Sequence, residues 1–357
     1  MISDRDLPFA DYITRCRAII KERRVDLQSR NANLIIDTNS PYELYPHQTT
    51  PSNRRLKYGV LLLHGLLDCP LSLKDLGKHL QANGILCKSI LLPGHGTTPN
   101  DLLSITFQDW INAVHYGIAN LSKEVDHLYL AGFSTGAALS IHEALQTSSL
   151  SGIILIAPAI RIKVPMNMIV AWHYLKKWLH INHNQWIYKI KEVDYAKYLS
   201  IPFNAVNQVS LLTDLVKGLR LQHTLTCPIF MAVSREDETI SSEKALRFFS
   251  AYQHKDSKLV VYSSTPETFT DKRIINRLTH YPALNIKNFS HMSLPYSKDN
   301  PHYGQHGDYA YASHQDGNKY GAYNLYESTL TKNQYRQLTY NPDFDYMANE
   351  ITKFILR

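Results

Sequence analysis

The residue of this chain most suited to chemistry is Ser134, because its surroundings match those of a nucleophile. It stands at the centre of Gly132-Phe-Ser-Thr-Gly136, a G-x-S-x-G pattern. An apolar run over 128–131 precedes the pattern, and a helix-like run over 137–144 follows it. A serine between a strand and a helix occupies a sharp turn that exposes its oxygen at the amino end of the helix, where N–H groups favour negative charge. We therefore predict a nucleophilic serine; the alternative is an ordinary serine-glycine turn.

A second motif, His64-Gly-Leu-Leu67, predicts donors for the negative oxygen that attack by a serine creates. It follows directly after the apolar run over 58–63. The backbone N–H groups of Leu66 and Thr135 are the expected donors of an oxyanion hole. We expect the His64 side chain to orient this loop or to contact the substrate. An ordinary tight turn is the alternative at this point.

The elements that must position these groups alternate along the chain between short apolar runs and longer helical patterns. The expected strands cover 58–63, 85–92, 127–131, 153–156, 228–233 and 259–262. Helical patterns cover 9–27, 71–82, 107–121 and 341–356. This alternation is typical of βαβ units, and uninterrupted apolar strands indicate a sheet covered on both faces. The sequence therefore predicts an α/β fold with a mostly parallel central sheet flanked by helices.

We expect one catalytic unit with additions rather than two domains. Residues 57–157 and 227–357 form the expected core, and residues 1–56 form an N-terminal helix and loop extension. Between residues 158 and 226 the alternation stops, which predicts an inserted helical cap over the carboxyl edge of the sheet. The alternative is a pair of ordinary surface helices packed elsewhere.

The predicted cap is rich in aromatic and methionine side chains, which suit the binding of flexible chains. Four of its residues are candidates for substrate binding in an acyl-chain pocket: Met166, Ile169, Trp172 and Phe203. The alternative is that each of them attaches the cap to the core. Lys176 and Lys177, beside Trp178, also suggest a weak peripheral contact with a membrane surface.

Together with Leu92-Pro-Gly-His-Gly-Thr97, these motifs resemble those of the α/β-hydrolases. Within that superfamily the chain resembles bacterial monoacylglycerol lipases and carboxylesterases, a group of serine aminopeptidase-like and lysophospholipase-like hydrolases. The resemblance extends in order over residues 57–296. It implies an α/β-hydrolase fold and a serine hydrolase that cleaves short or medium acyl esters, or monoacylglycerol-like lipids, through an acyl-enzyme. Ala137 departs from the pattern, since many relatives have a further glycine there, and this should affect packing alone.

The resemblance also implies where the acid stands. In this fold the acid and then the histidine follow the serine along the chain. Relatives place the acid after the strand that corresponds to 228–233, with an aliphatic residue three positions later, and Asp237 with Ile240 fits this register. The neighbours Glu236 and Glu238 could be mistaken for it.

The histidine must follow the acid, and the resemblance implies His291. It comes directly after an expected short strand over 285–289, where a strand-end loop could reach both the serine and the acid. His280 precedes a Tyr-Pro turn and is interpreted as structural. The polar stretch over 263–277 is expected to be an inserted loop.

The same Ser-His-Asp set would also serve a thioesterase or an aminopeptidase. An aminopeptidase needs a carboxylate in the cap to hold the substrate amine, and Glu192 and Asp194 are the candidates. A non-catalytic binding protein of this fold is the third alternative. It is disfavoured because every residue type that the reaction needs is present.

Composition limits the partners. The chain of 357 residues has 38 Lys and Arg against 31 Asp and Glu, a net charge of +7 without long basic blocks, which argues against nucleic acid as a partner. No run of apolar residues is long enough for an integral membrane span. The charged N-terminal residues and four scattered cysteines favour a cytoplasmic location without disulfides. The oligomeric state is not predicted.

A histidine-rich segment over 302–314 raises the question of a metal. Imidazole and carboxylate groups are good ligands, but their spacing here matches no familiar zinc pattern. We therefore expect neither a metal nor a cofactor, and interpret the segment as a long loop that borders the cleft.

Overall fold

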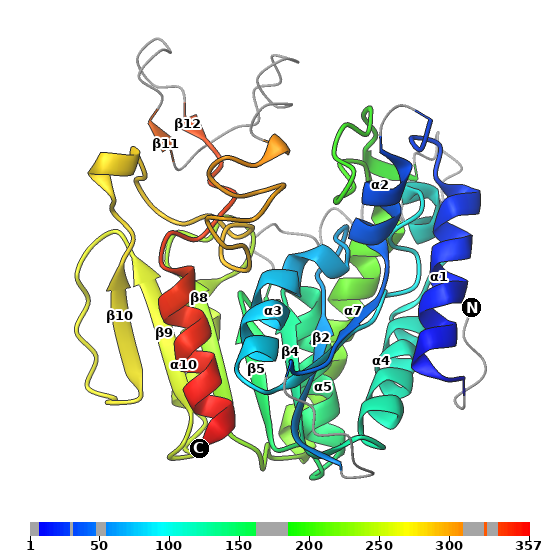
Figure 1. Ribbon diagram of the computed structural model, residues 1–357. Helices are drawn as coiled ribbons and strands as arrows, with labels where there is room; N and C mark the ends of the chain where they lie inside the picture. The colour runs from blue at the N-terminus through cyan, green and yellow to red at the C-terminus, as the bar shows by residue number, and fades with distance from the viewer. Residues whose placement is uncertain (1–6, 29–30, 48–54, 162–184, 310–324, 327–334) are drawn as a thin grey trace, which may run out of the picture.

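The centre of the fold is an eight-stranded sheet in the order β1-β3-β2-β4-β5-β8-β9-β10 (Figure 1). Neighbouring strands run parallel, except that β1 pairs antiparallel with β3. The strands are β1 (Tyr42–Leu44), β2 (Leu56–Leu63), β3 (Leu86–Ser89), β4 (Val125–Phe133), β5 (Gly152–Ile156), β8 (Ile229–Ser234), β9 (Lys258–Ser263) and β10 (Ile274–Leu278). The structure is a computed structural model that describes residues 7–28, 31–47, 55–161, 185–309, 325–326 and 335–357. The expected mostly parallel sheet is confirmed.

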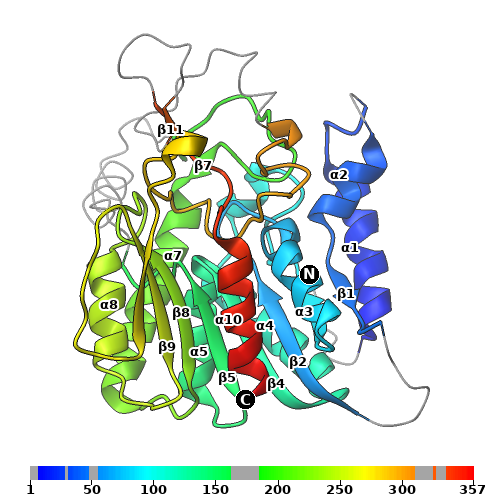
Figure 2. The ribbon, with the colours of Figure 1, turned by 60° about the vertical axis from the view of Figure 1, so that its left-hand side comes forward.

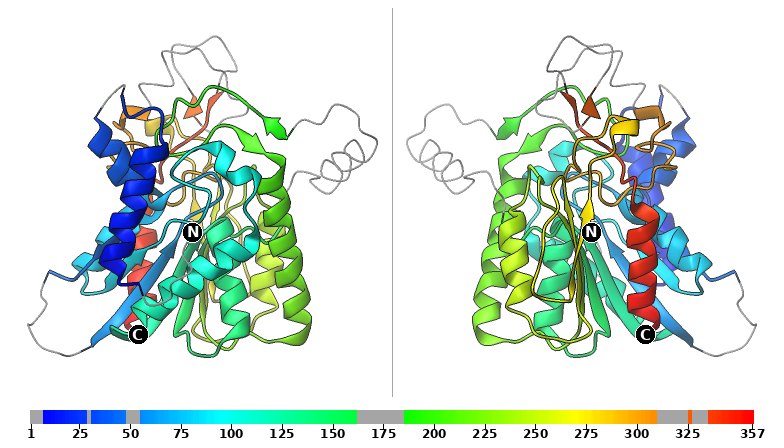
Figure 3. Two further views of the ribbon diagram at one scale, coloured as in Figure 1. Left: turned by 90° about the vertical axis from the view of Figure 1, so that its right-hand side faces the viewer. Right: turned by 90° about the vertical axis from the view of Figure 1, so that its left-hand side faces the viewer.

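Helices cover both faces of this sheet (Figures 2 and 3). One face carries α1 (Phe9–Arg23), α4 (Phe107–Leu121), α5 (Thr135–Gln146), α7 (Phe203–Gln222) and α8 (Ser242–Ser250). The other face carries α3 (Lys74–Ala82) and α10 (Phe344–Leu356), which contact each other. Alternate side chains of β2 enter the two apolar layers, Leu61 and Leu63 on one side and Val60 and Leu62 on the other. The central strands are therefore apolar over their inner and carboxyl-terminal parts, because both of their faces are buried there.

Shorter elements connect these layers. They are α2 (Ala32–Asn39), η1 (Pro70–Leu73), η2 (Pro99–Leu103), η3 (Pro282–Leu284), β6 (Trp186–Tyr188), β7 (Ile201–Pro202), β11 (Leu325–Tyr326) and β12 (Tyr335–Arg336). The strands β6 and β7 pair antiparallel, as do β11 and β12. In Figure 1 the segment around β6 and β7 and the segment after β10 lie beyond the same end of the sheet. Both segments therefore surround the carboxyl ends of the parallel strands.

The helix α7 lies inside the segment predicted as a cap, 158–226. It packs against α5 and α4, and its buried apolar side chains belong to the cluster that these helices share (Figure 3, left). This part of the segment is therefore a helix of the layer beside the sheet. Residues 162–184, with the candidates Met166, Ile169 and Trp172, lie outside the described residues, so the cap and its acyl-chain pocket stay predictions.

The last strand of the sheet differs from the prediction. β10 begins within the stretch 263–277 that was expected to be a loop, and it pairs with β9 along its whole length. The predicted strand over 285–289 is wrong, because the backbone there makes a single bridge between Ile286 and Tyr281. β10 is an edge strand of intermediate burial, so it lacks the continuous apolar run that marks the central strands.

A buried histidine ties the chain beyond β10 to the segment before β7. His302 Nε2 lies 2.9 Å from Asp194 Oδ1, and His302 Nδ1 contacts Asp308. The Tyr303 hydroxyl donates to the second oxygen of Asp194. Burial disfavours the imidazolium, but the two carboxylates outweigh this effect and raise the pKa of His302 to about 9. His302 is therefore a buried cation held between two anions.

We expect His302→Gln to lower the melting temperature at neutral pH and to have little effect above about pH 10. A pKa raised from about 6.5 to about 9 means that the native state binds the proton more tightly than the unfolded state does. The difference in proton-binding free energy is on the order of 3 kcal/mol. This stabilisation is complete below the unfolded pKa and is lost as the pH rises through about 9. Thermal unfolding followed by circular dichroism across this pH range measures it.

The matched control is His306→Gln, which removes an exposed histidine of the same segment. Its melting temperature should follow that of the unmodified protein at every pH. An equal loss of stability for His302→Gln at acidic and strongly alkaline pH would contradict the buried cation.

Candidate active site

Ser134 occupies a sharp turn between β4 and α5. Its φ of 54° and ψ of −111° are values that residues other than glycine rarely adopt. A Cβ atom at Gly132 would lie 2.2 Å from the carbonyl carbon of Gly136, and one at Gly136 would lie 2.1 Å from the carbonyl oxygen of Leu63. Both glycines are therefore required for the close approach of neighbouring backbone. The turn places the serine at the N-terminus of α5, whose first N–H groups have no partner within the helix.

Three side chains predicted from distant parts of the sequence meet at this turn. His291 Nε2 lies 3.0 Å from Ser134 Oγ, and His291 Nδ1 lies 2.7 Å from Asp237 Oδ2. All three residues are buried, with His291 and Ser134 retaining 8% and 9% exposure. The imidazole can therefore donate from Nδ1 to the carboxylate and accept the serine hydroxyl proton at Nε2.

The neighbours of Asp237 have other partners. Both the N–H and the hydroxyl of Ser264 donate to Glu236 Oε1, at 2.9 and 2.6 Å. Glu238 Oε2 accepts from the backbone N–H of His291, at 3.0 Å, rather than from its ring. Of the three consecutive acids, Asp237 is thus the one that contacts the imidazole, and its other oxygen is held by the N–H groups of residues 239 and 240.

The protonation of His291 depends on this carboxylate. Burial disfavours the imidazolium, but Asp237 outweighs burial, so the pKa of His291 is raised above its usual value. Glu238 contributes in the same direction, and the ammonium of Lys197 acts against it. The histidine is therefore a stronger base than a free imidazole.

The loop after β2 lies directly against the serine. A Cβ atom at Gly65 would lie 3.3 Å from the Cβ of Ser134. Within the described ranges, the N–H groups of Leu66 and Thr135 donate to no protein acceptor. Both groups are thus available to a bound oxygen, and their use as an oxyanion hole stays a prediction.

Two buried histidines hold this loop in place. The N–H of Leu67 donates to His95 Nε2 at 3.1 Å, and the N–H of Leu92 donates to His64 Nε2 at 3.0 Å. The other ring nitrogen of His64 lies 2.9 Å from the carbonyl oxygen of Gly65. Burial lowers the pKa of both imidazoles, that of His95 to about 4, so both rings are neutral. Both ring nitrogens of His64 are therefore occupied by backbone groups, which favours the predicted role of orienting the loop over a contact with the substrate.

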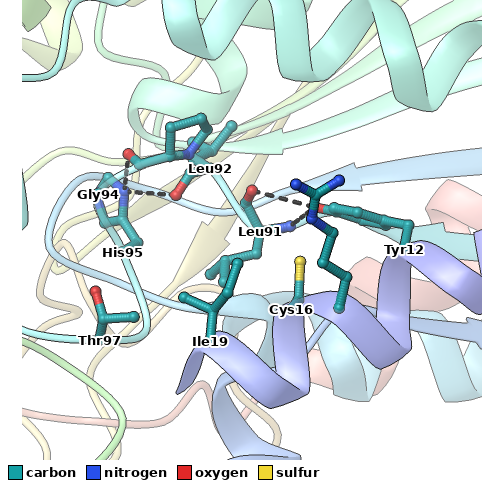
Figure 4. A pocket seen from close by; sticks show the side chains of 10 residues that line it. Tyr12, Cys16, Ile19, Leu91, Leu92, Gly94, His95 and Thr97 are labelled. Atoms are coloured by element: carbon teal, nitrogen blue, oxygen red, sulfur yellow. Dashed lines mark hydrogen bonds between the residues drawn. The ribbon is translucent and has the colours of Figure 1, made fainter. Parts of the chain in front are cut away.

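His95 also borders a pocket beneath α1 (Figure 4). The pocket has a volume of about 480 Å³, part of it open to solvent, and is mainly apolar. Its lining includes Tyr12, Cys16, Ile19, Leu91, Pro93 and Thr97. On one side of the pocket, the Tyr12 hydroxyl accepts a hydrogen bond from the N–H of Leu91 at 2.9 Å. The pocket thus lies beside the histidine that holds the loop, and Ser134 is not among the residues that line it.

The remaining predicted site residues are placed as follows. The N–H groups of Leu199 and Ser200 donate to Glu192 at 2.7 and 2.9 Å. Asp194 is fully engaged with His302 and its neighbours, as described above. Phe203 is the half-buried first residue of α7. Neither candidate carboxylate is therefore free to hold a substrate amine.

Sequence reasoning missed two charged residues beside the site. Lys197 Nζ lies 3.8 Å from Asp68 Oδ2 and 6.0 Å from the ring centre of Phe133. The ring of Phe133 in turn lies 5.1 Å from the ring of His291. Asp68 directly follows the His64–Leu67 motif in the chain, and this position could have identified Asp68 from the sequence. No spacing links Lys197 to the other site residues.

The described residues contain no group of three histidine, cysteine or acidic side chains able to hold a metal. The four cysteines are free and buried. None of the helices in the described ranges combines the length and the apolar character needed to cross a bilayer.

Comparison with known proteins extends these observations. The family model described as serine aminopeptidase, S33 matches residues 55–265. A thermostable monoacylglycerol lipase from Bacillus sp. (strain H-257) is 27% identical over 203 residues, which are 57% of this chain and 79% of the lipase. A carboxylesterase from Bacillus subtilis (strain 168) is 24% identical over 213 residues, 59% of this chain and 85% of the esterase.

A solved structure described under the metagenome-derived lipolytic enzymes LipS and LipT superposes with a TM-score of 0.52 at 22% identity, covering 62% of this chain and 86% of that one. This likeness supports the fold alone. The resemblance predicted from the motifs is confirmed, since the family model includes both the loop motif after β2 and the Ser134 turn. The chain belongs to the serine aminopeptidase S33 family of α/β-hydrolases.

Proposed function

We propose that this chain is a serine hydrolase that cleaves carboxylic esters, with Ser134 as nucleophile, His291 as general base and acid, and Asp237 as the residue that orients the histidine. The observation that carries the proposal is the pair of contacts made by one imidazole, 3.0 Å to Ser134 Oγ and 2.7 Å to Asp237 Oδ2. This is the arrangement in which a nucleophile is activated by a base that a third group holds in place.

In the proposed reaction the Ser134 oxygen attacks the ester carbonyl carbon while its proton passes to His291 Nε2. The negative oxygen of the tetrahedral intermediate accepts from the N–H groups of Leu66 and Thr135. His291 then gives the proton to the leaving alcohol, which leaves an acyl-enzyme. A water molecule activated by the same imidazole releases the acid and restores the serine. Asp237 keeps Nε2 unprotonated and stabilises the imidazolium that forms in each step.

The substrate that we propose is a small acyl ester or a monoacylglycerol-like lipid. Two relatives named as a monoacylglycerol lipase and a carboxylesterase support an ester. The family name also raises an aminopeptidase, which would hold a cationic amine by a carboxylate. Glu192 and Asp194 are occupied by other donors, and the ammonium of Lys197, which opposes a positive charge on His291, would also repel an ammonium group. These contacts favour esters.

The direct test of the nucleophile is covalent labelling. A fluorophosphonate probe should label the unmodified protein once and should not label Ser134→Ala, because an activated serine oxygen attacks the phosphorus, displaces fluoride and becomes a phosphonate ester. Intact-mass spectrometry and in-gel fluorescence measure the outcome. Ser122→Ala, which removes an exposed hydroxyl at the end of α4, is the control and should label normally. Labelling that persists in Ser134→Ala would refute the assignment.

Replacement of the acid should affect both rate and pH dependence. Asp237→Asn is expected to lower kcat by roughly 10³- to 10⁴-fold, because the histidine loses the partner that fixes its tautomer. Since the carboxylate raises the pKa of His291, kcat/KM of the unmodified protein should fall as the pH drops through that pKa. In Asp237→Asn the same fall should occur at lower pH. Hydrolysis of p-nitrophenyl butyrate from pH 5 to 9 measures both effects.

Glu236→Gln is the matched control, because this neighbouring acid is bound to Ser264 instead. Its rate and its pH profile should stay close to those of the unmodified protein. A large loss of rate in Glu236→Gln, with little loss in Asp237→Asn, would reassign the acid.

The choice between ester and amine substrates is a separate prediction. We expect kcat/KM for p-nitrophenyl butyrate to exceed that for alanine p-nitroanilide by roughly 100-fold or more, because Glu192 and Asp194, the two carboxylates considered for holding an amine, are bound by other donors. The release of nitrophenol and nitroaniline measures both rates. Faster turnover of the alanine substrate would favour an aminopeptidase.

A further inference from the structure

Lys197 is a mostly buried cation with unused hydrogen-bond donors. Its side chain is 18% exposed, and the nearest carboxylate oxygen, Asp68 Oδ2, is 3.8 Å away, beyond hydrogen-bonding distance. Within the described part of the chain, its ammonium donates to no acceptor. An ammonium held by a counter-ion at this distance keeps N–H donors that an acceptor on a bound molecule can accept from.

The carboxylate behind it is also incompletely bonded. Asp68 is 2% exposed, and its Oδ1 accepts from the N–H of Cys69 at 2.9 Å and from the Tyr296 hydroxyl at 3.4 Å. Its Oδ2, which faces Lys197, accepts no hydrogen bond. Asp68 thus serves as a buried counter-ion that attracts the ammonium to this side of the site without engaging its donors.

The segment that carries Lys197 is fixed to the loop after β2, residues 64–67, which we call the oxyanion loop. The N–H of Tyr198 donates to the carbonyl oxygen of Leu67 at 2.8 Å, and the Tyr198 ring stacks on His95 with an interplanar angle of 4°. The Tyr198 hydroxyl accepts from the N–H of Thr97 at 2.7 Å. On the other side of the lysine, the Asn39 amide donates to the carbonyl oxygen of Tyr195 at 2.8 Å. The backbone on both sides of Lys197 is therefore held in one place.

This fixed position is next to the reacting groups. The ammonium lies near the ring of Phe133, which immediately precedes Ser134 and contacts the His291 ring. It acts electrostatically on His291 and on His64, the histidine that orients the loop. The ammonium thus lies on the side of the site where Phe133 and His291 meet.

We propose that Lys197, held by Asp68, is a specificity-determining residue that donates a hydrogen bond to a hydroxyl group on the alcohol part of the ester. The inference rests on the proposed ester hydrolysis and names the class of alcohol that it releases, a polyol such as glycerol. An ammonium suits the polar end of an amphipathic ester, because the acyl chain has no acceptor to offer it. Asp68 already provides the negative charge, so a second anion would be repelled, whereas a neutral hydroxyl would fill the vacant donor.

The test compares three esters of butyric acid: 1-monobutyrylglycerol, propyl butyrate and 1-butyrylglycerol 3-phosphate. They share the acyl group and a three-carbon alcohol, and differ in hydroxyl and phosphate groups. The unmodified protein should prefer monobutyrylglycerol to propyl butyrate in kcat/KM. Lys197→Met, which keeps the length of the side chain and removes the donor, should lower this preference roughly tenfold or more. Lys189→Met, which removes an exposed lysine from the same segment, should keep the preference.

The substrate ratio separates the possible outcomes. The proposal is overturned if the unmodified protein shows no preference for monobutyrylglycerol over propyl butyrate, or if Lys197→Met keeps the preference. This holds even if Lys197→Met is poorly folded, because misfolding lowers the rates for both esters together. A selective loss of the phosphate-bearing ester would identify an anion site and would equally overturn it. Failure of the proposed function is distinct: no ester, including p-nitrophenyl butyrate, would then be hydrolysed in a manner that depends on Ser134.

Discussion

The structure depends on one close approach of backbone, at the point where α5 begins beside the end of β2. Gly136 lies so near the carbonyl oxygen of Leu63 that no Cβ fits between them. This contact allows the chain to turn from β4 into α5 with Ser134 in a strained conformation. The strain costs on the order of 1–3 kcal/mol. The conformation is nevertheless stable, because the buried parallel strands around it cannot move apart. The same contact brings the loop after β2 against the serine. The positions of Ser134 and of the loop after β2 are thus set by a single packing constraint.

The features that the sequence predicted well are those determined by local chemistry. The strands β2, β4, β5, β8 and β9 are buried on both faces, so their composition alone indicates them. The Ser134 turn needs glycine at two fixed offsets, so it has a readable signature. Assignment of Asp237 and His291 needed in addition the order of the acid and the histidine that α/β-hydrolases share, because no local pattern distinguishes Asp237 from Glu236. The contacts in the structure supply that distinction.

The features that could not be predicted depend on tertiary contacts or on position in the sheet. β10 is an edge strand, and its intermediate burial removes the apolar run by which central strands are detected. The α7 helix follows a break in the alternation and was therefore assigned to the cap, although it packs on α5. Asp194 was a candidate for binding an amine because an isolated carboxylate in a sequence has no visible partner. Its actual partner, His302, is more than a hundred residues away.

The network around His302 orders polar groups near the site. Asp194 is bound by His302 and Tyr303 from the segment after β10, and Tyr296 of that segment also bonds to Asp68. The segment before β7 is thereby held from one side by a buried ion pair, and from the other by the bond between Tyr198 and the oxyanion loop. Buried charges of this kind each require a single arrangement of their partners. The segment before β7 and the segment after β10 are therefore held together, and this contact fixes the backbone around Lys197 next to the loop after β2.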